Sequence, residues 1–164
     1  MEVTDGRTWR EQYDRMQRWH VRVAESSGVD ERRIDDFYAV FTCCFHFKDW
    51  LKADTTVAQP VGVDAEKGLF DAETGLRWFQ VCADLVNGSK HLLIDRAVRV
   101  DPATRLGKAG GVFDPRVFDS RAFDVGTVCV YADGGAWDAL ELANTCMRLW
   151  DSFLRRWDLL ENST

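Results

Sequence analysis

The sequence lacks the features that mark several large classes of protein. No uninterrupted apolar run approaches the length of about eighteen residues that a membrane-spanning helix needs. The N-terminus has no basic stretch followed by an apolar one, so it does not resemble a secretory signal. The five cysteines are an odd number without a CxxC pair, which favours reduced, buried thiols over a disulfide framework. We therefore expect a soluble, cytoplasmic chain.

Positive charge is also scarce. The chain has 21 Lys and Arg against 27 Asp and Glu, a net charge of −6 at pH 7. This balance argues against broad, non-specific binding of nucleic acid, although it leaves room for a local basic patch. There is no GxGxxG after a strand pattern, no Walker loop and no nucleophile elbow. We expect no cofactor.

Large apolar side chains are plentiful. Hydrophobic residues make up 46% of the 164 residues, and ten Phe and seven Trp are among them. A chain of this length and composition is typical of one globular domain with a substantial core. The sequence therefore predicts a single domain over residues 1–164.

Four segments show the three- and four-residue spacing of amphipathic helices. The first covers residues 7–26, with Thr8 or Asp5 as its cap, and the second follows Asp30 to about residue 52. The third begins between residues 64 and 73 and ends at Asn87-Gly88. The fourth has an apolar stripe from Ala136 to Trp157.

Two segments alternate with a period of two, as strands do. They cover residues 91–100 and 122–132, and they enclose a Gly-rich segment at 104–120. We interpret them as an antiparallel hairpin around a long loop. The predicted fold is mainly α, a four-helix bundle with a β-hairpin inserted at about 91–132, between the third and fourth helices.

The third predicted helix ends in a polar segment, Asn87-Gly-Ser-Lys-His91, with Asp84 one turn earlier. A histidine in this position is suited to acid/base chemistry near neutral pH, and an amide and Lys90 are suited to contacts with phosphate. These groups are the minimum for metal-independent cleavage of RNA, in which the 2′-hydroxyl is the nucleophile. A plain helix C-terminus, with Lys90 and His91 complementing the helix dipole, explains the same residues.

The segment resembles the motif of HEPN domains, small helical bundles found in prokaryotic toxins, phage-defence proteins and ribonucleases. That motif is an Arg, often followed by a polar residue such as Asn, and a His four to six residues after the Arg, near the end of a late helix. Asn87 and His91 match the polar residue and the histidine. Together with the sequence Phe45-His-Phe-Lys-Asp-Trp50, the segment also resembles uncharacterised small bacterial and phage proteins.

The resemblance implies a helical bundle that acts on RNA as a homodimer, with metal-independent endoribonuclease activity as the expected reaction. Its catalytic residues would be His91, Lys90 and Asn87. The motif arginine would stand at position 84, 85 or 86, which hold Asp, Leu and Val. Lys90, Arg96 or a partner subunit could supply the cation. The long apolar stripe of the last helix is a second reason to expect self-association.

Further residues are candidates for contacts with the substrate: Asp84, Ser89, Arg96, His46 and Asp49. His46 and Asp49 could also bind a metal with help from His20 and His91, but no Glu-x-x-His occurs, and a local hydrogen bond explains the pair as well. We expect no metal, and inert cysteines, since their neighbours are apolar. The alternative function is a non-catalytic module that docks a protein partner through its hairpin and Gly-rich loop.

Overall fold

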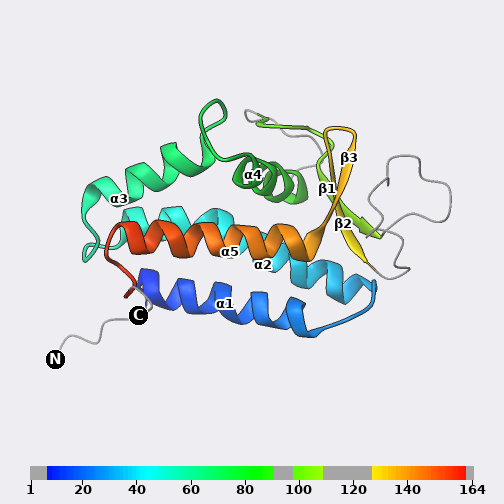
Figure 1. The fold of residues 1–164 in the computed structure, drawn as a ribbon, viewed down its shortest axis with the longest axis horizontal. Helices are drawn as coiled ribbons and strands as arrows, with labels where there is room; N and C mark the ends of the chain where they lie inside the picture. The colour runs from blue at the N-terminus through cyan, green and yellow to red at the C-terminus, as the bar shows by residue number, and fades with distance from the viewer. Residues whose placement is uncertain (1–6, 91–97, 109–126, 162–164) are drawn as a thin grey trace.

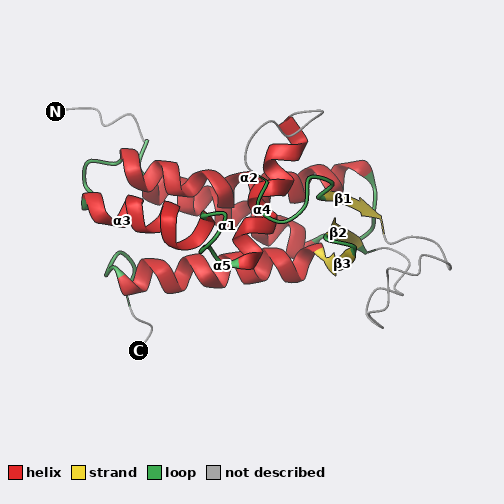
Figure 2. Cartoon of the chain, turned by 90° about the horizontal axis from the view of Figure 1, so that it is seen from above, coloured by secondary structure: helices red, strands yellow, loops and turns green. Residues whose placement is uncertain are grey.

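The computed structural model describes residues 7–90, 98–108 and 127–161 (Figure 1). The fold is mainly helical, as predicted, with a small three-stranded antiparallel sheet. Helices α1 (Trp9–Glu25), α2 (Glu31–Ala53) and α5 (Ala139–Arg156) run along the long axis of the molecule, and α4 (Arg77–Lys90) is seen nearly end-on, crossing them (Figure 1). Figure 2 shows the sheet at one end of these helices.

The first two helices begin at residues that the sequence identified. The Thr8 hydroxyl accepts a hydrogen bond from the Glu11 N–H at 3.3 Å, and the Asp30 carboxylate accepts one from the Arg33 N–H at 2.9 Å. Both side chains satisfy N–H groups that the first turn of a helix leaves without a partner. The long helix α2 is buried at ten of its positions, and the predicted bounds of both helices are confirmed to within a few residues.

The segment between α2 and α4 differs from the prediction. A short helix α3 (Gln59–Asp64), with Pro60 in its first turn, continues into a π-helical turn η1 (Ala65–Leu69). A turn follows, in which the Asp71 carboxylate accepts hydrogen bonds from two N–H groups and the Asp71 carbonyl accepts one from Gly75. The predicted single helix is therefore wrong over this region. Helix α4 also continues through Gly88 to Lys90.

The sheet uses partners that the sequence did not predict. Strand β2 (Val128–Ala132) lies between β1 (Arg105–Lys108) and β3 (Gly135–Asp138). Residue Val130 pairs with Leu106 on one side and with Trp137 on the other. Strand β1 falls inside the predicted loop at 104–120. Of the predicted strand at 91–100, residues 91–97 lie outside the described residues and residues 98–100 are not a strand.

Strands β2 and β3 form a hairpin because Asp133 and Gly134 both have positive φ, 50° and 71°. A two-residue turn with this backbone matches the twist of paired strands. We predicted the last helix from residue 136, and this is wrong: residues 135–138 extend the sheet, and α5 begins at Ala139. The Asp138 carboxylate caps α5 through the N–H groups of Leu140 and Glu141.

The centre of the core is Trp150 on α5, which has no exposed surface. Its ring centre lies 4.8 Å from that of Phe47, 5.3 Å from that of Phe79 and 5.6 Å from that of Phe153. The apolar stripe of α5 is thus covered by other helices of the same chain, and it gives no reason to expect self-association. No helix in the described ranges has the length and apolar character needed to cross a membrane.

Candidate functional site

The C-terminal end of α4 carries the predicted polar segment. Asn87 and Gly88 are half-buried, and the exposed Ser89 donates a hydrogen bond from its hydroxyl to the Val86 carbonyl at 2.8 Å. Lys90 is the last residue of the helix. His91 and Arg96 lie outside the described residues, so their predicted roles stay predictions.

Asp84, one turn before Asn87, has no exposed surface. Its carboxylate accepts hydrogen bonds from the backbone N–H groups of Arg99 (2.9 Å), Val100 (2.6 Å) and Asp101 (3.1 Å). These bonds fasten the chain, where it returns after residue 97, to the middle of α4. A contact with substrate would require the carboxylate to leave these donors, so its evident role is structural.

Cationic groups gather around the ring of Phe45 on α2. The Lys48 ammonium lies 4.3 Å from the ring centre, and the Arg99 guanidinium lies 5.9 Å from it. The His46 ring centre is 5.0 Å from that of Phe45. We refer to Phe45, His46, Lys48, Asp49 and Arg99 as the Phe45 cluster. A cation over the face of an aromatic ring and within about 6 Å of its centre is attracted by the negative charge of that face.

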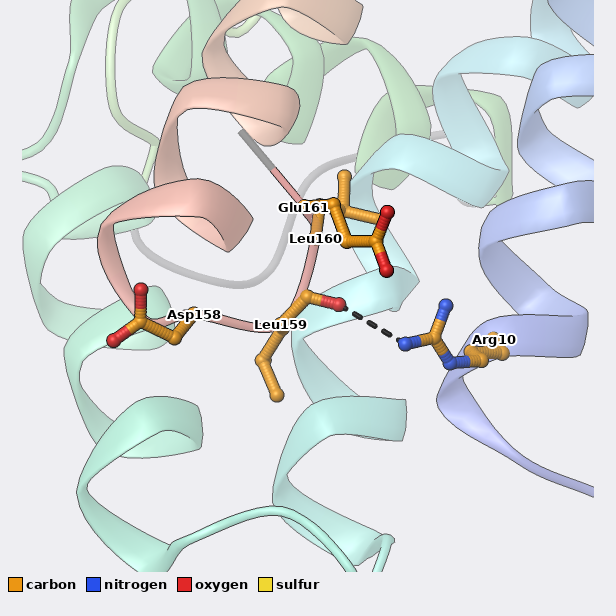
Figure 3. Close-up of a pocket in the computed structure, with 5 residues that line it drawn as sticks. All are labelled: Arg10, Asp158, Leu159, Leu160 and Glu161. Carbon is orange, nitrogen blue, oxygen red and sulfur yellow. Dashed lines mark hydrogen bonds between the residues drawn. The ribbon is translucent and has the colours of Figure 1, made fainter. Parts of the chain in front are cut away.

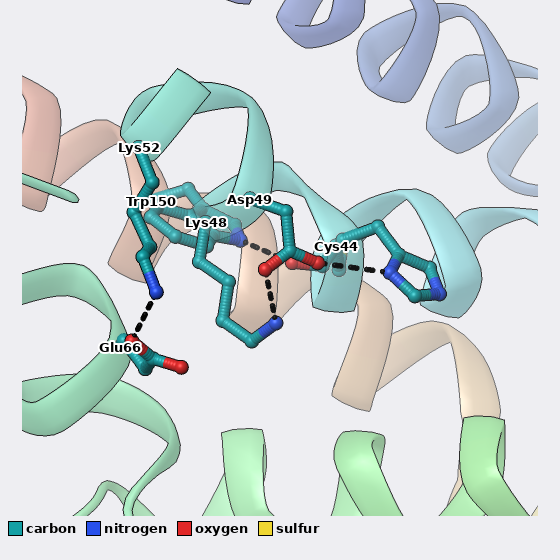
Figure 4. A network of polar contacts seen from close by, with 7 residues as sticks. Cys44, Lys48, Asp49, Lys52, Glu66 and Trp150 are labelled. Atoms are coloured by element: carbon teal, nitrogen blue, oxygen red, sulfur yellow. Dashed lines mark hydrogen bonds and ion pairs between the residues drawn. The ribbon is translucent and has the colours of Figure 1, made fainter. Parts of the chain in front are cut away.

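Asp49 is the acidic member of the Phe45 cluster. Its carboxylate accepts hydrogen bonds from the Lys48 ammonium at 2.8 Å (Figure 4) and lies 3.1 Å from Nδ1 of His46. Burial alone would raise the pKa of the Asp49 carboxyl, but the hydrogen bonds from Lys48 and His46 outweigh it, and the pKa lies below its usual value. The local contact between His46 and Asp49, one of the two interpretations of this pair, is confirmed.

Arg99 is the member of the Phe45 cluster that sequence reasoning missed. Its backbone N–H is bound by Asp84, and its side-chain Nε donates a hydrogen bond to the Phe70 carbonyl at 2.6 Å. The first contact fixes the Arg99 backbone against α4, and the second fixes its guanidinium at the Phe70 carbonyl. No local pattern reveals the position, because Asp84 and Arg99 are fifteen residues apart.

The histidines do not assemble into a metal site in the described part of the chain. His20 lies 2.6 Å through Nε2 from the Asn144 amide oxygen, which joins α1 to α5 and not to the Phe45 cluster. The described ranges hold no group of three or more His, Cys, Asp or Glu residues placed to bind a metal ion. All five cysteines are buried. Hydrogen bonds from Cys44 and Cys82 lower the pKa of the Cys146 thiol, whereas burial raises the pKa of the Cys43 and Cys82 thiols. Thiols of this kind are poor nucleophiles.

A separate hollow of about 660 Å³ lies between the first turn of α1 and the segment after α5 (Figure 3). Arg10 lines this hollow, and its guanidinium donates a hydrogen bond to the Leu159 carbonyl at 3.2 Å. Asp158 and Glu161 are also on its wall. The contact ties the end of the chain to α1, and this accounts for the position of Arg10.

Comparisons with protein-family models, with curated proteins and with solved structures found no match for this chain.

Proposed function

We propose that the chain is a HEPN-like helical bundle that acts on RNA at the C-terminal end of α4. The observation that carries the proposal is the position of Arg99. The HEPN motif needs a cation close to its histidine, and positions 84–86 of this chain do not provide one. The Arg99 backbone N–H is bound by Asp84 of α4, one turn before Asn87, and in this proposal the Arg99 guanidinium supplies that cation from the returning chain.

In this proposal the Phe45 cluster extends the site along α2. Arg99 and Lys48 attract the phosphate backbone, and the partly exposed pair of His46 and Asp49 contacts the ribose or base. Asn87 and Lys90 hold the phosphate that is cleaved. Ser89 and Arg96 are further contacts with the strand.

The reaction is an intramolecular transfer at phosphorus. The 2′-hydroxyl oxygen of the RNA forms a bond to phosphorus while the bond from phosphorus to the 5′-oxygen breaks, and the products are a 2′,3′-cyclic phosphate and a 5′-hydroxyl. His91 accepts the proton of the 2′-hydroxyl, and the leaving 5′-oxygen takes up a proton from solvent. Arg99 stabilises the negative charge that builds up on the phosphate oxygens. A homodimer that joins two such sites is part of the proposal.

The test is cleavage of an RNA panel by the purified protein and by two variants. His91→Ala abolishes cleavage under this proposal while RNA binding persists. Arg99→Gln weakens binding and cleavage together, since the cation contacts the substrate. Equal degradation by wild type and His91→Ala, or no degradation of any RNA by the wild type, would show that the catalytic part is wrong.

A non-catalytic interaction module is the second candidate. Strand β1 favours it, because in the described ranges β1 is an edge strand that pairs with β2 alone, and on this strand the Leu106 N–H donates to the Tyr38 hydroxyl at 3.4 Å rather than to another strand. In this candidate the Gly-rich segment completes the docking surface beside β1, so removal of residues 110–120, which spares β1, abolishes capture of the protein partner and leaves the thermal stability of the bundle nearly unchanged.

A further inference from the structure

Arginines are concentrated at the start of the chain. Residues 7–33 contain seven arginines and five acidic residues, whereas the whole chain has a net charge of −6. Where α1 ends and α2 begins, a hollow of about 310 Å³ opens. The cationic and hydroxyl residues on its wall define what we term the arginine hollow: Arg22, Ser26, Ser27, Arg32 and Arg33.

Two carboxylates also line the arginine hollow, and both are already engaged. Asp30 caps α2 by accepting the Arg33 N–H at 2.9 Å. Asp36, which is 7% exposed, accepts a hydrogen bond from Nε of Arg22 at 2.8 Å. Neither carboxylate neutralises the other two arginines, and within the described ranges Arg32 and Arg33 form no ion pair. The hollow therefore keeps an excess of positive charge.

The Arg33 side chain is held in place before any ligand arrives. Its Nη1 donates to the Ser26 hydroxyl at 2.7 Å, and that hydroxyl donates in turn to the Val23 carbonyl at 3.4 Å. The guanidinium carbon lies 5.3 Å from the ring centre of Phe37. Its Nε is buried and has no hydrogen-bond acceptor among the described residues. An arginine fixed in this way loses little conformational entropy when it binds an anion.

We propose that the arginine hollow binds a phosphate group. A tetrahedral phosphate offers several acceptor oxygens, and three guanidinium groups and the Ser27 hydroxyl around one hollow offer donors from several directions. A carboxylate has two oxygens in one plane and would leave most of these donors unused. The site lies at the junction of α1 and α2, apart from Asp84 and the Phe45 cluster, so it does not depend on the RNA-cleaving function proposed above.

The inference is tested by titrating the whole protein with inorganic phosphate in a calorimeter, and with short single-stranded RNA that carries either a 5′-phosphate or a 5′-hydroxyl. We expect saturable phosphate binding that Arg33→Gln weakens by about tenfold, because one charge-assisted hydrogen-bonding group is lost. Arg33→Lys also weakens it, since the planar fork is gone. Arg18→Gln, which removes an equal charge from an exposed position of α1, stays within about twofold of wild type.

The two RNA ligands identify the source of the phosphate. If the wild type prefers the 5′-phosphorylated strand and Arg33→Gln removes this preference, the hollow binds a terminal phosphate. If the wild type binds both strands equally and Arg33→Gln weakens both, the hollow binds internal phosphates. If Arg33→Gln does not fold, Arg32→Gln, at an exposed position, takes its place. The inference would be overturned if the wild type showed no saturable phosphate binding, or if Arg33→Gln and Arg32→Gln both kept the wild-type affinity. Either result holds whatever the outcome for His91→Ala.

Discussion

Asp84→Asn is the change that most directly tests how this fold holds its candidate site. The carboxylate is fully buried and satisfies three backbone N–H groups, at distances between 2.6 and 3.1 Å. An asparagine side chain has only one acceptor oxygen. Its NH2 group would face backbone N–H groups, which are also donors, so no hydrogen bond could form there. Since the side chain keeps its size, packing changes little.

The expected magnitude follows from the hydrogen bonds that are lost. A hydrogen bond to a charged group contributes about 1.5–3 kcal/mol, and a buried N–H left without an acceptor costs about 1–3 kcal/mol. With at least one N–H of residues 99–101 orphaned and the others bound by a neutral oxygen, we expect the free energy of unfolding to fall by about 3 kcal/mol. A domain of this size has about 5–15 kcal/mol in total.

Urea denaturation, followed by tryptophan fluorescence, measures this loss, and hydrogen exchange of the amides at 99–101 reports it locally. Asp133→Asn is the matched control, because that carboxylate and its ion-pair partner Arg77 are both exposed; we expect its cost to stay within about 1 kcal/mol. If Asp84→Asn unfolds at the wild-type urea concentration with unchanged exchange, the structural role that we give to this carboxylate is wrong.

Two further changes test the core. Burial, together with the hydrogen bond to Asp151 at 2.6 Å, raises the pKa of the Tyr13 phenol. The neutral phenol then contributes stability below its unfolded pKa of about 10, and the contribution is lost as the pH rises above that value toward the folded pKa. Urea midpoints from about pH 8 to about pH 11 should therefore fall more steeply for wild type than for Tyr13→Phe; parallel curves would contradict the assignment. Trp150→Phe removes the hydrogen bond from Nε1 to the Cys44 carbonyl (3.1 Å) and leaves a cavity in the centre of the core. We expect it to lower the free energy of unfolding by about 2 kcal/mol in the same assay, and a loss below about 0.5 kcal/mol would mean that the core repacks freely.

The position of the candidate site was only partly open to prediction. Asp84 and the end of α4 were identified from a local pattern of polar residues. Arg99 was not, because its place depends on two contacts made far along the chain, with Asp84 and with the Phe70 carbonyl. The pairing of Arg33 with Ser26 depends on the loop geometry between α1 and α2 in the same way.

In the sheet, one strand could be predicted from the sequence, but its partners could not. The apolar alternation at 122–132 indicated a strand, and β2 does occupy 128–132. Its partners followed from features that alternation does not carry: the positive φ of Asp133 and Gly134 permits a tight hairpin, and β1 is only four residues long. Short strands give too few residues for a period of two to stand out.

By itself, the sequence determined the mainly helical class, the capped starts of α1 and α2, and the inward face of α5. These features depend on neighbouring residues and on an apolar spacing that repeats over several turns, and both are written in the order of the chain. Only the tertiary structure decided that the buried Asp84 carboxylate would bind the backbone after residue 97, and that Arg99 would lie beside Phe45. It also decided that β2, from the predicted hairpin, would pair with β1 and β3. Those outcomes depend on which segments meet in space, because a buried carboxylate or a strand edge is satisfied by whichever N–H groups the fold brings to it.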